Sequence, residues 1–167
     1  MLAGALGSPG MRSYSGPKPR AHHTAASLAD DRLLCFGGSD GETSFADAHV
    51  LDLSTMGWSQ PTVRGAPPAA RSGHAAVCLD GVRVLVHGGW VPSTVAIFDD
   101  VALLDTDTWS WSRPKLHGAP PRARVGHSLV AMNAADGRDA ARLVLFGGRA
   151  DGDAALDDLY ELRPVAA

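Results

Sequence analysis

The sequence predicts an all-β fold built from three consecutive copies of one strand-rich unit. An apolar run that ends in Gly-Gly occurs three times, at residues 33–38, 84–89 and 143–148, and the flanking residues return with a period of 51 to 59 residues. The 19 Gly and 11 Pro fall mainly between short apolar runs, as is typical of strands joined by turns. Self-similarity at such a period indicates a repeat architecture.

Each copy carries the same landmarks in the same order: an Arg-x-x-His segment, the Gly pair, an Asp that opens an apolar run, and a Trp in the first two copies. The landmarks are Arg20, His23, Gly37, Gly38, Asp47 and Trp58, then Arg71, His74, Gly88, Gly89, Asp100 and Trp111, then Arg124, His127, Gly147, Gly148 and Asp158. A residue that returns once in every copy is expected to hold the fold together. We therefore interpret the landmarks as structural.

Four short strands are expected in each copy. The first follows the landmark His and is rich in small residues, and the second is almost continuously apolar, which indicates burial on both faces. The third begins at the landmark Asp, and the fourth contains Trp58 or Trp111. A Trp side chain buries roughly 150–250 Å², so both are expected to pack between units. Asp80-Gly81 predicts a two-residue hairpin turn between the first two strands of the second copy.

The segments GAPPAARSGH (65–74) and GAPPRARVGH (118–127) follow the pattern Gly-x-x-Pro-x-x-Arg-x-Gly-His and, with the Gly pairs, resemble the kelch repeat. The resemblance covers residues 17–163 and implies that each copy is one four-stranded blade of a β-propeller. His22 departs from the pattern because the other copies have Gly there, and His87 stands where they have Phe. The third copy lacks a Trp after its Asp. We therefore expect a kelch-type β-propeller segment of three four-stranded blades, the third incomplete.

The repeat boundaries divide the chain into blades. We expect blade 1 at 17–62, blade 2 at 63–115 and the incomplete blade 3 at 116–163. Residues 1–16 are interpreted as an N-terminal tail or a degenerate outer strand, and residues 164–167 as a C-terminal tail.

The sequence shows no pattern that indicates catalysis, a metal or a cofactor. The landmark histidines are spread one per blade, and there is no His-x-x-x-His or Cys/His cluster. No Ser/His/Asp signature and no phosphate-binding Gly loop is present. We expect no catalytic residue, no metal site and no cofactor. The alternative is a fragment of a kelch-like propeller enzyme whose active site lies mostly outside this chain.

The charge balance argues against a nucleic-acid partner. The chain has 15 Lys and Arg against 18 Asp and Glu, a formal net charge of −3, whereas nucleic acid requires a basic face. No apolar run reaches the roughly 18–20 residues of a membrane span. Cys35 and Cys78 lie in strand-like runs without a CxxC pair, which indicates thiols in a reducing compartment. We expect a cytoplasmic protein, with the nucleus as the alternative.

The resemblance implies a protein-interaction scaffold of the adaptor or effector type, part of a larger propeller. The loops between second and third strands are expected to bind the protein partner, since loops vary while strands hold the frame. In the middle loop, Trp90, Val91, Val95 and Ile97 stand where the other copies have mostly polar residues or Gly. Exposed apolar and aromatic residues are typical interface anchors. The alternative is that this loop folds onto its own blade, and full burial of Trp90 would rule out binding through it.

Three blades are fewer than the roughly four to eight of a closed propeller. The first and last blades are therefore expected to expose apolar faces and, at residues 158–163, an unpaired strand edge. We expect either further blades in a longer chain or self-association of two chains into a six-bladed ring.

Overall fold

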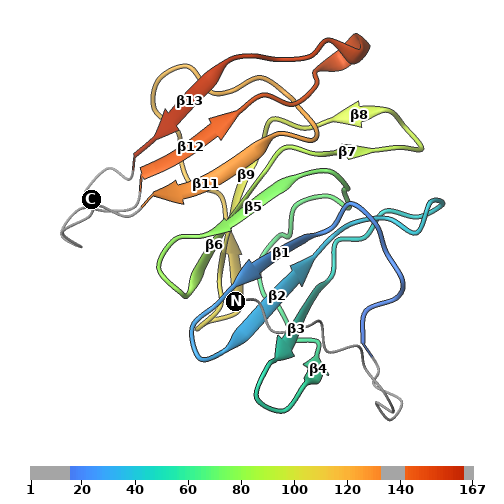
Figure 1. Cartoon of the computed structure of the whole chain (residues 1–167), viewed down its shortest axis with the longest axis vertical. Helices are drawn as coiled ribbons and strands as arrows, with labels where there is room; N and C mark the ends of the chain where they lie inside the picture. Colours follow the sequence, from blue (N-terminus) through green and yellow to red (C-terminus); the bar gives the residue numbers. More distant parts are fainter. Residues whose placement is uncertain (1–15, 133–141, 164–167) are drawn as a thin grey trace, which may run out of the picture.

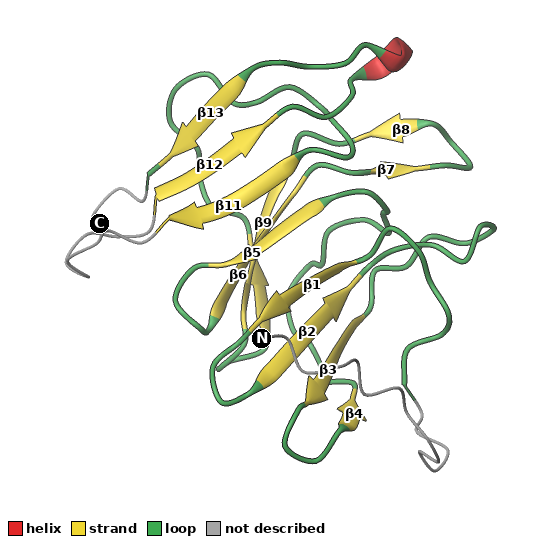
Figure 2. Cartoon of the chain, viewed as in Figure 1, coloured by secondary structure: helices red, strands yellow, loops and turns green. Residues whose placement is uncertain are grey.

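Three antiparallel sheets fan out around a common axis in the computed structural model, which describes residues 16–132 and 142–163 (Figure 1). The strand orders are β1-β2-β3-β4, β10-β9-β6-β5 and β11-β12-β13. Apart from the 3₁₀ turn η1 (Asp151–Asp153), the described residues form strands, turns and loops (Figure 2). This arrangement confirms the predicted kelch-type propeller segment with an incomplete third blade.

Each blade starts with its innermost strand. Blade 1 contains β1 (Thr24–Ser27), β2 (Arg32–Phe36), β3 (Ala48–Asp52) and β4 (Gly57–Ser59). Blade 2 contains β5 (Ala75–Cys78), β6 (Arg83–His87), β9 (Val101–Asp105) and β10 (Ser110–Ser112). Blade 3 contains β11 (Ser128–Met132), β12 (Arg142–Phe146) and β13 (Leu159–Leu162). The loop between β6 and β9 forms a small extra hairpin of β7 (Trp90–Val91) and β8 (Ala96–Ile97).

Some of the predicted segments lie outside the described residues. These are the N-terminal tail or outer strand up to residue 15, the insertion at 133–141 and the C-terminal tail at 164–167.

The innermost strands lie side by side, with β5 in contact with both β1 and β11 (Figure 1). Their small residues allow this approach, as Ala25 and Ala26 do in β1. The second strand of blade 2 is buried on both faces: Val84 and Val86 point to blade 1, and Leu85 between them points to blade 3. A strand covered on both sides explains the continuous apolar runs before the Gly pairs.

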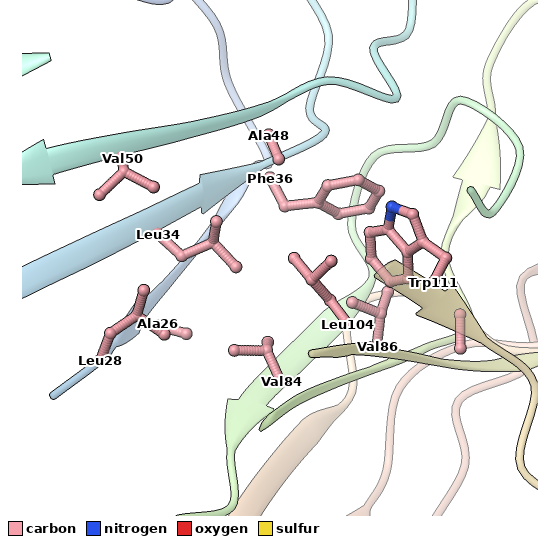
Figure 3. Packing of buried hydrophobic residues seen from close by; sticks show 11 residues of the cluster. Ala26, Leu28, Leu34, Phe36, Ala48, Val50, Val84, Val86, Leu104 and Trp111 are labelled. Carbon is pink, nitrogen blue, oxygen red and sulfur yellow. The ribbon is translucent and has the colours of Figure 1, made fainter. Parts of the chain in front are cut away.

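Two apolar cores join the three blades. The first joins one face of blade 1 to blade 2 and contains Leu34, Phe36, Val84 and Leu104 (Figure 3). The second joins the opposite face of blade 2 to blade 3 and is centred on Leu85, Val101 and Leu143. Each core therefore lies between blades, and a blade is stable only when its neighbour covers it.

The two blade tryptophans lie in different surroundings. Trp111 in β10 is buried against Phe36 of blade 1, with ring centroids 5.1 Å apart (Figure 3). Trp58 in β4 is half-buried, and the backbone of Gly16 lies against its ring. The difference follows from position, because Trp111 faces a neighbouring blade and Trp58 faces outward from blade 1.

The turn between β5 and β6 differs from the predicted two-residue hairpin. The Leu79 N–H donates to the Arg83 carbonyl at 2.8 Å, which leaves a three-residue loop from Asp80 to Val82. The Gly81 carbonyl accepts a 2.8 Å hydrogen bond from the Ala29 N–H of blade 1. The longer turn thus contacts the neighbouring blade.

Replacing Trp111 tests whether stability depends on the core between blades. Trp111→Ala is expected to lower the free energy of unfolding by about 3–5 kcal/mol, since it leaves a cavity against Phe36. Trp58→Ala is the matched control and is expected to cost clearly less, because Trp58 is half-buried. Urea denaturation followed by tryptophan fluorescence and circular dichroism measures both, and equal losses would contradict the assignment.

Candidate functional site

A buried arginine lies at the same end of every blade, the end where the loops between second and third strands are found. The landmark arginines pair with the landmark aspartates through both guanidinium nitrogens, at 2.6 and 3.0 Å for Arg20 with Asp47. The same pairing joins Arg71 to Asp100 at 2.6 and 3.1 Å. It joins Arg124 to Asp158 at 2.6 and 2.9 Å.

The rest of each guanidinium is also satisfied. In blade 2, Arg71 donates to the carbonyls of Gly88 and Ala69, each at 2.9 Å, and its guanidinium stacks on the Phe98 ring at 4.2 Å. The Phe98 ring is half-buried under the Arg71 guanidinium and is not part of the two apolar cores. A planar donor with this many partners fixes the start of the inner strand relative to the third strand.

The neighbouring cations lower the pKa values of the landmark carboxyl groups. Burial alone would raise the pKa of Asp47, but hydrogen bonds and charge from Arg20 and His49 lower it to about 2. For Asp100, burial is likewise outweighed by Arg71 and Arg113, which lower its pKa below the usual value. Both carboxylates are charged at neutral pH.

The Gly pairs of blades 1 and 2 receive the Arg-x-x-His segments of blades 2 and 3. The N–H groups of Gly38 and Gly89 donate to the carbonyls of Arg71 and Arg124 at 2.9 and 2.8 Å. In return, the N–H groups of Arg71 and Arg124 donate to the carbonyls of Phe45 and Phe98 at 3.0 and 3.1 Å. Backbone hydrogen bonds thus join consecutive blades at their loop end.

The landmark histidines complete these junctions. The His74 ring contacts Phe36 edge-on, with centroids 5.4 Å apart, and its Nε2 lies 2.8 Å from Thr24 Oγ1. The His127 ring takes the same position against His87, with centroids 4.8 Å apart, and its Nε2 lies 2.9 Å from His87 Nδ1.

The landmark histidine has a different polar partner at each of the two junctions. Thr24 pairs with Phe36 across β1 and β2, whereas Ala75 pairs with His87 across β5 and β6. Blade 1 therefore binds His74 of the next blade through a hydroxyl. Blade 2 lacks that hydroxyl, and the ring nitrogen of His87 binds His127 in its place.

Burial keeps these imidazoles neutral. Desolvation, helped by Arg71, lowers the pKa of His74 to about 3. Desolvation and the charge of Arg124 lower the pKa of His87 to about 4 against the opposing charges of Asp100 and Asp99. Desolvation and His87 lower the pKa of His127 to about 3. Among the described residues, no group of three His, Cys, Asp or Glu could hold a metal ion.

A pocket of about 290 Å³ opens at the same end of the axis, lined by residues from all three blades. Its lining residues are His22, Gly73, Trp90, Val125, Gly126 and Arg149. Four of them lie one or two residues before a landmark His, and Trp90 and Arg149 directly follow a Gly pair. The backbones approach closely there, because the Gly73 N–H donates to His22 and the Gly126 N–H to Gly73, at 2.9 and 2.8 Å.

The four candidate binding residues lie on the β7–β8 hairpin beside this pocket. Trp90 and Val91 are half-buried in β7, where they pair with Ile97 and Ala96 of β8. Val95 at the hairpin turn is 63% exposed. The Trp90 backbone is held by two 2.9 Å hydrogen bonds with Ser72, so the hairpin is anchored while the Trp90 ring borders the pocket.

The sequence pattern pointed to the residues of the loop between β6 and β9 but not to the other pocket residues. Val125 and Gly126 lie between landmark residues, and Arg149 directly follows the Gly pair. The available signal was the repeat itself, because equivalent positions in successive blades come together around a propeller axis. In the sequence the landmark Arg and Asp are separate features, whereas in the structure they form one ion pair in every blade.

The chain is a segment of a repeat propeller, and comparisons identify which kind. The KLHDC2/KLHL20/DRC7 Kelch-repeats domain matches residues 11–138. The chain therefore belongs to the kelch-repeat family. No helix in the described part of the chain is long and apolar enough to cross a membrane.

Several curated proteins are similar to this chain. Acyl-CoA-binding domain-containing protein 4 of Arabidopsis thaliana is 41% identical over 133 residues, which cover 79% of this chain and 19% of that protein. The Rab9 effector protein with kelch motifs of Bos taurus is 33% identical, over 89% of this chain and 39% of its own length. Host cell factor 2 of Homo sapiens is 33% identical, over 90% of this chain and 19% of its own length. The chain thus spans between a fifth and two fifths of these relatives.

The Arg71 junction can be tested by a substitution that keeps the charge. Arg71→Lys is expected to lower the free energy of unfolding by roughly 1–3 kcal/mol, because one ammonium cannot replace the paired donors and leaves acceptors unsatisfied. Arg113→Lys is the control, since Arg113 is an exposed partner of the same Asp100 and should change stability by about 0–1 kcal/mol. Similar effects in urea denaturation would contradict the proposed role.

The buried histidines predict a loss of stability in acid. Their pKa values in the folded chain lie below the value of about 6.5 expected when unfolded. As the pH falls below about 6.5, the unfolded chain binds more protons, so the free energy of unfolding falls until about pH 4 or lower. Ala75→Thr combined with His87→Phe rebuilds the junction of blade 1 and should lose less stability over this window. Denaturation at several pH values measures this, with exposed His117→Ala as the control, and identical profiles would refute it.

Proposed function

We propose that this chain is a non-catalytic protein-interaction module that binds its partner at the pocket and the adjoining β7–β8 hairpin. The observation that carries the proposal is Trp90, a half-buried aromatic side chain in the wall of a pocket lined by all three blades. Aromatic residues next to a concave surface are typical binding hot spots. The function is that of an adaptor or effector, in line with the word effector in the name of one relative.

The surroundings of Trp90 indicate what kind of segment binds. Two glycines and Val125 form part of the pocket wall, and Val95 adds an exposed apolar side chain nearby on the hairpin turn. An apolar or aromatic side chain projecting from the partner would fill this pocket. The Trp90 backbone is already held by Ser72, so little chain ordering is required when the partner binds.

The proposed setting is the cytoplasm, with the nucleus as the alternative. Cys35 is buried, Cys78 is half-buried, and both are free thiols. Unpaired cysteines in a small β-rich domain suit a reducing compartment. No metal or cofactor is required by the proposal, because the pocket offers packing surface and no cluster of ligating side chains among the described residues.

A peptide selection tests the proposal directly. Random peptides displayed on phage are selected against the purified chain, and enriched peptides are measured by fluorescence anisotropy. Trp90→Ala is expected to weaken binding by about 30-fold or more, which corresponds to the 2 kcal/mol of a hot spot. Leu53→Ala is the matched control, since Leu53 is 47% exposed in a turn at the other end of blade 1. Failure to enrich peptides, or equal binding by Trp90→Ala, would refute the proposal.

A further inference from the structure

We infer that His22 determines the specificity of the proposed pocket and is kept there at a cost in stability, because its ring binds an acidic side chain of the partner. This role rests on the proposed function and adds the chemical character of the partner to it. The segment that binds then carries an Asp or Glu next to the apolar or aromatic residue that enters the pocket.

The backbone of His22 has a left-handed conformation that the other blades give to glycine. The φ of His22 is 56°, and the equivalent residues Gly73 and Gly126 have φ values of 62° and 69°. This region is unfavourable for residues with a Cβ, although His enters it more often than most. Glycine at position 22 would keep the carbonyl that accepts the 2.9 Å hydrogen bond from the Gly73 N–H. The fold therefore does not require a side chain at this position, and a strained residue in a pocket wall indicates function.

The His22 side chain adds little packing that would compensate for this conformation. It is exposed in the wall of the pocket, whereas the landmark residues His74 and His127 are buried at junctions between blades. At the equivalent position of blade 2 a side chain is excluded, because a Cβ on Gly73 would lie 2.5 Å from Val125 Cγ2. The imidazole of His22 thus faces the space that the partner would enter.

Other departures from the repeat gather at the same pocket. The residue directly after the Gly pair is Ser39 in blade 1, Trp90 in blade 2 and Arg149 in blade 3. The backbone of each forms two hydrogen bonds of 2.8 or 2.9 Å with the residue two positions before the landmark His of its blade. Equivalent backbones therefore carry three different side chains, and His22 adds an imidazole where the other blades have glycine. The pocket is asymmetric, with an aromatic ring from blade 2 and N–H donors from blades 1 and 3.

The donors on the polar side of the pocket suit a carboxylate. The planar guanidinium of Arg149 matches the two oxygens of a carboxylate, and an imidazole donates through one N–H when neutral and two when protonated. Asp151 and Asp157 are exposed on the same loop as Arg149 and offset part of its charge. Positive charge alone therefore does not select an acidic segment, and the hydrogen bond from His22 makes the selection.

His22→Gly separates binding from folding, because it removes the ring and relieves the backbone. Random peptides displayed on phage are selected in parallel against the wild-type chain and this variant, and both pools are sequenced. Asp or Glu next to an apolar residue should be enriched by the wild-type chain only. In fluorescence anisotropy, His22→Gly is expected to bind the most enriched peptide about 10-fold more weakly. The urea midpoint of the variant should stay unchanged or rise by up to about 0.5 M.

Two further variants and one peptide serve as controls. His117→Gly also removes an exposed imidazole, but His117 lies outside the residues that line the pocket, so binding should not change. His22→Asn keeps an N–H donor on a residue that tolerates the left-handed conformation, and should bind more tightly than His22→Gly. A peptide with its Asp or Glu replaced by Asn or Gln should bind the wild-type chain about 10-fold more weakly, yet lose little affinity for His22→Gly.

The outcomes distinguish this inference from the proposed function. Equal binding by His22→Gly and the wild-type chain, or enriched peptides without Asp or Glu, would overturn the inference, while weak binding by Trp90→Ala would still support the proposed function. A lowered urea midpoint in His22→Gly would overturn it as well, because the ring would then be needed for the fold. So would His22→Asn that binds no better than His22→Gly. If the wild-type chain enriches no peptide, the proposed function and this inference both fail.

Discussion

The fold depends on one close contact, the docking of the Arg-x-x-His segment of one blade against the Gly pair of the blade before it. At Gly37 and Gly88 the next blade comes so near that a Cβ would lie 2.8 and 2.7 Å from its closest atoms, and both residues have a φ of 64°. Both conditions favour glycine. Because the two backbones can meet there, the hydrogen bonds, the histidine ring and the apolar core of each junction come into register together.

The charged groups at the loop end serve this same contact. Arg71 is nearly fully buried, and a buried guanidinium is tolerated only when its charge and its donors are paired. Asp100 and two carbonyls meet that requirement and hold the landmark segment in the orientation that the preceding blade receives. The same argument explains why Arg and Asp recur as a pair in every blade, at separations of 27, 29 and 34 residues.

Two departures from the repeat differ in what they do for the fold. His87 replaces a Phe and the neighbouring Ala75 lacks a hydroxyl, and together these two changes preserve one hydrogen bond to His127. Trp90 is another departure. It occupies the position of Ser39 in blade 1, which is 6% exposed, and of Arg149 in blade 3, and it is half-buried at the pocket. We expect a partner to bind at this bulky aromatic residue, because the other two blades have polar residues at its position.

The sequence by itself determined the repeat, the strands and the family, because the landmarks return in fixed order and the apolar runs match strands buried on both faces. It also identified Trp90 and its loop as unusual. The tertiary structure decided which landmarks touch: Arg71 meets Asp100 within its blade, and His127 meets His87 across a junction. The tertiary structure also formed the pocket, because its residues are far apart in the chain and come together only around the propeller axis. Local pattern fixes each strand, whereas the angle between blades comes from packing that no single repeat contains.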